Sequence, residues 1–331
     1  MTDYLYHSAR IRALEGAILG KDKLERILAA DGEDAVLALL NECGILPVTD
    51  EESGRLLREE TLLGILRRAY DEIRSLAPDE AVLLLWRYPY DCNNVKAAIK
   101  GFLRKIDPRS MMFDFGTLEI DAVIRMAETG DFSGLSPAMA LAADEAVRAF
   151  ARTQNPQQID LLLDKACYRD MLTAAQNSGV RFAEALVRER IDLINLQIVV
   201  RILRMKMGES GRALLGESLL EGGRISHDQL LEWFEAGESV MWDRLYYTEY
   251  GKLAEKVVQT DRGLTAIERS ADDFWMAHIR EAKYVSYGPE VLIAFLQAHE
   301  YEVRNLRIIL AGRAARLNVE TIRERIREGY V

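Results

Sequence analysis

The chain has 331 residues, of which 49% are hydrophobic and 29% charged, a composition typical of a folded protein with ample apolar surface to bury. Its formal net charge of −10 excludes nucleic acid as an expected partner, because phosphate binding requires a concentrated positive surface. Its longest clean apolar run, AVLLLW at 81–86, is far shorter than the roughly 20 residues of a transmembrane helix. The sequence therefore predicts a soluble protein without a membrane span.

Three cysteines, Cys43, Cys92 and Cys167, lie far apart in the sequence, and none belongs to a CxxC pair. A sparse and odd set of this kind predicts free, buried thiols in a reducing compartment rather than disulfides or a metal site.

The stretch EGAILGKD at 15–22 resembles the phosphate-binding loop of nucleotide-binding proteins. However, Glu15 occupies the position of the first glycine of such a loop, and Asp22 occupies the position of the magnesium-binding serine or threonine. The residues before it also have helical periodicity, whereas a phosphate-binding loop follows a strand. We interpret this stretch as a helix end followed by a turn.

A short motif occurs three times: an acid, an asparagine three residues later, an apolar residue, and then a long polar side chain. The second and third copies begin 101 and 211 residues after the first. The acid, the asparagine and the long polar residue of the three copies are Asp91, Asn94 and Lys96; Asp192, Asn195 and Gln197; and Glu302, Asn305 and Arg307. Pro89 predicts that the first copy begins in the first turn of a helix, whereas the second copy falls inside a longer helix.

Two interpretations of the motif remain open. Each asparagine could be a buried polar clamp that bonds to a neighbouring helix and fixes its register. Alternatively, the three motifs could line a shared central opening and contact a partner.

A second repeat supports the first. The segment 115–132 matches 222–239 at a shift of 107 residues, which aligns Gly130 with Gly237. A fainter counterpart lies at 21–34, with Gly32 in the position of these closing glycines. A third pair matches 161–171 with 265–275. Repeats of about a hundred residues exceed the period of ordinary solenoids. They predict three similar subdomains, 1–105, 106–210 and 211–331, arranged around a pseudo-threefold axis.

Helical spacing of apolar residues dominates the sequence, and strand signals are almost absent. We expect helices over 122–130, ended by Gly130, and over 183–208. Asn318 is expected to cap a last helix that ends at Gly329. The predicted fold class is all-α.

No residue pattern points to catalysis, a cofactor or a metal. The four histidines, His7, His227, His278 and His299, lack the spacing of a helical zinc site. The pair Asp272–Asp273 is expected to be solvated on a charged helix. The aromatic residues of 274–289 are expected to pack mainly in the core, and an exposed remainder could bind a partner.

The chain resembles the C-subunit family of archaeal- and bacterial-type V-type ATP synthases, equivalent to the d subunit of the eukaryotic vacuolar ATPase. The resemblance is carried by FLQAHEYEVRNLRIILAGRAARLNVETIRERIREGY at 295–330, by YDCNNVKAAIKG at 90–101, by IDLINLQIVVR at 191–201 and by YLYHSARIRALEG at 4–16. The order and spacing of these segments extend the resemblance over almost the whole chain. The middle copy departs most, because it has Gln197 in place of a cation and Ile202 in place of glycine.

The resemblance implies three helical subdomains that form a funnel. Such a protein would cap the membrane rotor ring of proteolipid subunits and accept the foot of the central shaft, which the D and F subunits form. It would be a non-catalytic rotor part, cytoplasmic and peripheral to the membrane. An unrelated all-α scaffold or adaptor that binds helical peptides is the alternative. The sequence leaves open whether the complex transports protons or sodium ions, and whether it synthesises or hydrolyses ATP.

Overall fold

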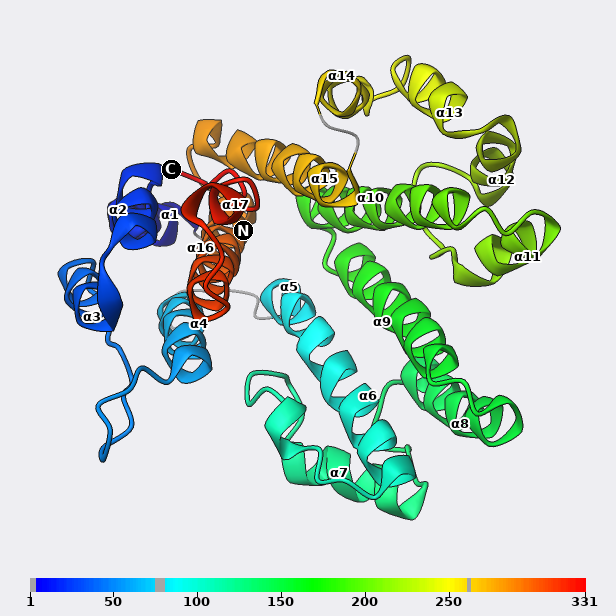
Figure 1. The fold of residues 1–331 in the computed structure, drawn as a ribbon, viewed down its shortest axis with the longest axis horizontal. Helices are drawn as coiled ribbons and strands as arrows, with labels where there is room; N and C mark the ends of the chain where they lie inside the picture. Colours follow the sequence, from blue (N-terminus) through cyan, green and yellow to red (C-terminus); the bar gives the residue numbers. More distant parts are fainter. Residues whose placement is uncertain (1–3, 75–80, 261–262) are drawn as a thin grey trace. The chain divides into compact units, whose positions relative to one another are not determined.

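The computed structural model describes residues 4–74, 81–260 and 263–331 (Figure 1). It consists of two compact units. We call Asp79–Met241 the central unit, and Met1–Pro78 together with Trp242–Val331 the terminal unit, because the latter contains both ends of the chain. The division falls inside α13 (Glu238–Leu245). The expected division into three subdomains is not tested by these two units and stays a prediction.

The central unit is built from helices that pack on their neighbours in sequence. They are α5 (Ala81–Leu84), α6 (Tyr88–Arg104), α7 (Ile120–Thr129), α8 (Pro137–Thr153), α9 (Gln157–Asn177), α10 (Arg181–Met205), α11 (Glu209–Ser218) and α12 (His227–Ala236). Helix α9 packs on α6, α8 and α10, so it lies at the centre of this unit. The start of α8 is fixed by Pro137 in its first turn and by Ser136, whose Oγ accepts a hydrogen bond from the Met139 amide.

The terminal unit combines helices from both ends of the chain. They are α1 (Tyr4–Leu14), α2 (Lys21–Ala29), α3 (Gly32–Glu42), α4 (Arg58–Arg74), α14 (Gly251–Gln259), α15 (Leu264–Ile279), α16 (Pro289–Ala314) and α17 (Val319–Arg323). Its core is α16, which packs on α1, α2 and α4. Figure 1 shows the blue α2 beside the red α17, and an ion pair between Arg323 and Glu25 joins them at 3.0 Å. The end of the chain is therefore packed against its beginning.

The prediction of an all-α fold is confirmed. Within the described residues no β-strand occurs, and the only strand-like pairing there is an isolated bridge between Thr49 and Leu56. Short 3₁₀ turns occupy Glu15–Ala17, Leu85–Arg87, Arg109–Met111 and Arg280–Tyr284. The first of these follows α1, as expected for the stretch that resembled a phosphate-binding loop. None of the helices in the described residues has both the length and the apolar content needed to cross a membrane.

The helix expected at 122–130 is confirmed as α7, and Gly130 ends it in a left-handed conformation with φ 71°. The helix expected at 183–208 is α10, but it ends earlier, because Lys206 already adopts a left-handed conformation. Lys105 and Arg316 do the same just after α6 and α16. All three cations stand eleven positions after the motif asparagine of their repeat. The three motif helices therefore end in the same way.

The last helix is shorter than predicted. Asn318 caps it as expected, since its Oδ1 accepts a hydrogen bond from the Thr321 amide at 2.7 Å. However, α17 ends at Arg323 instead of Gly329. The amides of Arg327 and Glu328 donate to side-chain oxygens of other helices, so these amides are not available to continue the helix.

The expectation that Asp272 and Asp273 are solvated is wrong. Their exposed fractions are 6% and 3%, because both side chains point into a cluster of cations. Asp272 accepts hydrogen bonds from Arg304 at 2.8 Å and from Arg327 at 3.0 Å. Asp273 binds Lys256 at 2.8 Å. The charged sequence of this helix could not predict the burial, because Lys256, Arg304 and Arg327 lie outside the helix.

The aromatic segment 274–289 is divided between core and surface. Trp275 is 5% exposed, in agreement with the expected core packing. In contrast, Tyr284 and Tyr287 are 91% and 61% exposed.

Candidate functional site: three repeated motifs

The asparagines of the three motifs make the same pair of hydrogen bonds. Each side-chain amide donates to the carbonyl and accepts from the amide of a single residue later in the chain. The pairs are Asn94 with Phe113, at 2.8 and 2.8 Å; Asn195 with Leu220, at 2.9 and 2.8 Å; and Asn305 with Arg327, at 3.0 and 2.9 Å. All three asparagines are fully buried. We call each pair an asparagine clamp.

The three clamps hold the segment that follows the motif helix, 19, 25 and 22 residues after the asparagine. A buried amide without a partner would cost about 1–3 kcal/mol, so satisfying both its donor and its acceptor on one residue fixes that segment closely. The first two clamps each join residues on opposite sides of a subdomain boundary expected from the sequence, at 105/106 and 210/211.

The acids of the first two motifs bind the same following segments. Asp91 accepts hydrogen bonds from the amides of Thr117 at 2.8 Å and Leu118 at 3.0 Å, and from the Thr117 hydroxyl at 2.7 Å. Asp192 accepts from the amides of Arg224 at 2.8 Å and Ile225 at 3.1 Å. Burial raises the pKa of Asp91 above its ordinary value, although the bonds from Thr117 and Leu118 oppose that effect.

The second sequence repeat is explained by a glycine that directly precedes the amides bound by each aspartate. A Cβ atom on Gly116 would lie 2.0 Å from Oδ1 of Asp91, and one on Gly223 would lie 2.1 Å from Oδ1 of Asp192. Real contacts of this kind do not occur, so the aspartates exclude any larger residue at these positions. The two repeats seen in the sequence therefore describe one structural unit: a motif helix and the segment that it holds.

The acid of the third motif reaches a different part of the chain. Glu302 accepts a hydrogen bond from the Leu19 amide at 3.1 Å, across 283 residues. Leu19 stands 98 positions before Thr117, the same distance that separates Gly32 from Gly130. Leu19 is therefore the repeat equivalent of Thr117, and it binds the acid of the third motif as Thr117 binds the acid of the first.

The position equivalent to Gly116 is Ile18 in this third copy. A glutamate is one methylene longer than an aspartate, so its carboxylate can reach the Leu19 amide while Ile18 keeps its side chain. The second carboxylate oxygen of Glu302 contacts Nδ1 of His299 at 2.5 Å.

The long polar residues of the motif point to a companion helix. Lys96 binds Asp164 of α9 at 2.5 Å, and Arg307 binds Glu59 of α4 at 2.6 Å. Burial tends to lower the pKa of Lys96, but the neighbouring Cys92 and Asp164 raise it above its ordinary value. Gln197 is uncharged, so the second copy lacks this ion pair, as its sequence indicated.

The described residues contain no group of three or more histidines, cysteines or acids that could hold a metal ion. Two of the histidines contact the motifs: the imidazole of His227 hydrogen-bonds to the Leu220 carbonyl at 3.0 Å, and His299 contacts Glu302. The three cysteines are free thiols; Cys92 and Cys167 are buried as expected, whereas Cys43 is only partly buried.

Sequence reasoning missed the residues on the other side of each clamp. Phe113, Leu220 and Arg327 offer only main-chain atoms, so their side chains carry no shared signature. The sequence signal that could have located these segments was the alignment of Gly116 with Gly223. In the structure both glycines lie against a motif aspartate.

The match to a family model decides the identity. Residues 7–325 match the model described as ATP synthase (C/AC39) subunit. The chain belongs to this family. Membership makes it an accessory subunit of a V/A-type ATP synthase and not the catalytic one.

Curated relatives cover almost the whole chain. The C subunit of the V-type sodium ATPase of Enterococcus hirae is 22% identical over 335 residues, which cover 98% of this chain and 99% of the relative. The C subunit of the A-type ATP synthase of Methanocaldococcus jannaschii is 24% identical over 349 residues, which cover 98% and 86%. The corresponding A-type protein of Thermococcus kodakarensis is 21% identical over 338 residues, which cover 99% and 91%.

Proposed function

We propose that this ATP synthase subunit is the part of the central stalk that joins a D–F shaft to the membrane rotor ring of proteolipid subunits. It transmits rotation between ion translocation and ATP synthesis or hydrolysis, without catalysing either reaction. It lies on the cytoplasmic side of the membrane and reaches the membrane through the ring.

The observation that carries this proposal is the cyclic use of the repeat. The first and second motif helices hold the segment that follows them in the chain, whereas the acid of the third motif holds Leu19, near the beginning of the chain. The helices that pack on the motif helices show the same difference. Helix α6 packs on α9, which comes later in the chain, whereas α16 packs on α4, which comes earlier. A chain in which the last repeat is completed by the first is suited to close on itself. A closed, funnel-shaped socket with pseudo-threefold symmetry is what a rotor part needs in order to enclose one shaft.

The clamps are structural in this proposal. Their side chains are buried and hydrogen-bonded to the main chain, so in this proposal they hold the walls of the socket and do not contact the shaft. The shaft instead meets exposed side chains, many of them charged, on a protein with a net charge of −10. Charged interfaces of this type strengthen encounter at low salt and weaken as salt is added.

Binding of the purified chain to a D–F shaft, measured by biolayer interferometry at low and high salt, tests the proposal. We expect saturable binding that weakens as the salt concentration rises. A wild-type chain with no affinity for the shaft at low salt would contradict the proposal.

A further inference from the structure

Helices α6 and α9 of the central unit pack against each other, and two of the three cysteines lie where they meet. Two ion pairs, both at 2.5 Å, set the register of the helices: Lys96 with Asp164, and Lys100 with Asp160. The next turn of this antiparallel pairing brings in Cys92, four residues before Lys96, and Cys167, three residues after Asp164. The register of the two helices therefore places the two cysteines opposite each other.

The sulfur of Cys92 lies against α9 at the level of Cys167. It is 3.5 Å from the carbonyl oxygen of Leu163 and 3.8 Å from Oδ1 of Asp164. Leu163 stands four residues before Cys167, so its carbonyl is the one to which the Cys167 amide bonds within the helix. Both cysteines are 2% exposed. Two thiols that face each other from packed helices have the proximity from which a disulfide can form.

The same position in the third repeat contains no sulfur. Val303 of α16 stands 211 positions after Cys92, and Leu62 of α4 stands 105 positions before Cys167. The ion pairs between the two helices of each repeat obey the same two shifts. Val303 and Leu62 are each 1% exposed, so ordinary apolar side chains fill this position. Packing of the repeat does not require two cysteines here, and their chemistry is what distinguishes the first copy.

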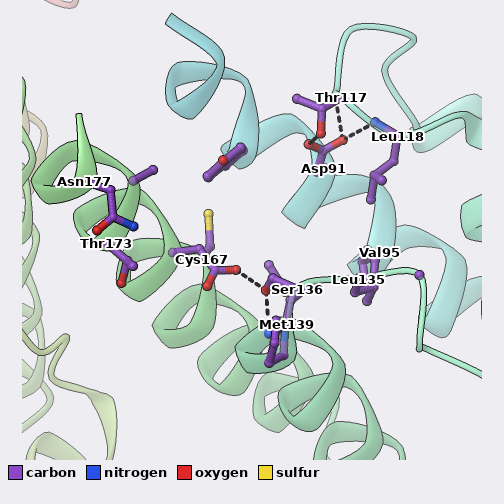
Figure 2. A pocket seen from close by; sticks show the side chains of 15 residues that line it. Asp91, Val95, Thr117, Leu118, Leu135, Ser136, Met139, Cys167, Thr173 and Asn177 are labelled. Atoms are coloured by element: carbon purple, nitrogen blue, oxygen red, sulfur yellow. Dashed lines mark hydrogen bonds between the residues drawn. The ribbon is translucent and has the colours of Figure 1, made fainter. Parts of the chain in front are cut away.

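A cavity of about 440 Å³ beside the first motif gives one of the two thiols access to small molecules (Figure 2). Cys167 lines it, together with the exposed side chains of Thr173 and Asn177. Asp91 and Asp170 also line it, and no lysine, arginine or histidine occurs among the described residues of its lining. The acids disfavour an anionic oxidant such as glutathione disulfide, whereas hydrogen peroxide is small and neutral.

The resting Cys167 thiol is protected against rapid oxidation. Its hydrogen bond with Cys92 and its burial both raise the pKa of the Cys167 thiol above the ordinary value. Because the thiolate is the reactive form, Cys167 reacts slowly at neutral pH. A sustained supply of oxidant is therefore needed to modify it.

We propose that Cys92 and Cys167 are a redox-sensitive pair that hydrogen peroxide converts into a reversible disulfide between α6 and α9. Peroxide oxidises the Cys167 thiolate to a sulfenic acid and releases hydroxide. The Cys92 sulfur then displaces the hydroxyl group of this sulfenic acid, which leaves as water with the proton of the Cys92 thiol. In total the two thiols lose two protons and two electrons, and the peroxide becomes two molecules of water. The inference does not depend on the proposed function.

Oxidation of the purified full-length chain tests the inference. The folded wild type is treated with hydrogen peroxide, its remaining thiols are blocked with N-ethylmaleimide, and linked peptides are identified by mass spectrometry. The urea-unfolded chain, treated in the same way, gives the peroxide dose that oxidises accessible thiols. Cys43→Ser is the matched control, because Cys43 lies in the terminal unit, and Cys92→Ser removes one member of the pair.

We expect an intramolecular link between Cys92 and Cys167 in the wild type and in Cys43→Ser, and its reversal by dithiothreitol. The link should raise Tm by about 5 °C or more, because it closes a loop of 75 residues. Cys92→Ser should show neither the link nor the rise in Tm. Thiols that stay free in the folded wild type at the dose that oxidises the unfolded chain would overturn the inference. A Cys167 sulfinic acid without the link, or a link that involves Cys43, would overturn it as well.

Discussion

The first and third motifs reach the same arrangement by different routes. Asp91 binds the Thr117 amide only 26 residues away, with a glycine directly before it. Glu302 binds the Leu19 amide across 283 residues, with Ile18 in the position of that glycine. The comparison teaches that the hydrogen-bond geometry is the repeated feature. The residue types that build this geometry differ: an aspartate faces a glycine in the first copy, and the longer glutamate faces Ile18 in the third.

Substitution of the glycines that face a motif aspartate should have the largest effect on stability. Gly116→Ala and Gly223→Ala place a Cβ about 2 Å from a carboxylate oxygen, and we expect each to destabilise the fold by about 3 kcal/mol. Gly64→Ala is the control, because nothing lies within 4 Å of its Cβ inside α4, and it should stabilise by about 0.5–1 kcal/mol. Urea unfolding followed by circular dichroism measures all three. Equal stability of Gly116→Ala and the wild type would contradict the acid-to-amide geometry.

Loss of an asparagine clamp should have the next largest effect. Asn94→Leu and Asn195→Leu should each destabilise by about 1–3 kcal/mol, because an amide and a carbonyl of the held segment lose their partners. Asn305→Leu should have a similar effect, since it removes the same pair of hydrogen bonds from Arg327. Unfolding experiments give the stability, and binding of the D–F shaft by the folded protein is measured alongside. Retained stability with lost shaft binding would show that the motifs line the socket instead.

Substitutions at the ends of the three motif helices should have similar effects on stability, because these ends have the same backbone conformation. Lys105, Lys206 and Arg316 all have φ between 52° and 57°, a conformation that costs a side chain more than glycine. Replacing each by glycine should therefore stabilise by about 0.5–1 kcal/mol, to a similar extent in all three repeats. Thermal unfolding of the three single variants gives the comparison. Destabilisation in any of them would mean that the cation has a contact that outweighs the strain.

The smallest expected effect concerns pH. Burial raises the pKa of Asp170 in the folded state, although Ser136 and Arg169 oppose this. A raised folded-state pKa adds stability at low pH, and this contribution is lost as pH rises through that pKa. The difference in unfolding free energy between the wild type and Asp170→Asn should therefore shift in favour of the wild type as pH falls from 7 toward about 4. A difference that does not change with pH over this range would contradict the assignment.

Much of the fold could be predicted from the sequence, because helix periodicity and caps are local. Gly130 and Asn318 marked a helix end and a helix start correctly. The end of α17 and the burial of Asp272 could not be predicted in this way, since both depend on partners far along the chain, such as Asn305 and Arg304. The motif residues themselves were recognisable by their spacing. Their partners were not, because hydrogen bonds to main-chain atoms leave no constraint on side-chain identity.

Hydrogen exchange at the Leu19 amide tests most directly whether the beginning of the chain completes the third repeat. In the wild type this amide should be protected to a degree comparable with Thr117, since both donate to a motif acid. In Glu302→Ala the protection of Leu19 should be lost, while that of Thr117 should persist. Rapid exchange of Leu19 in the wild type, or protection that survives the loss of Glu302, would contradict the account.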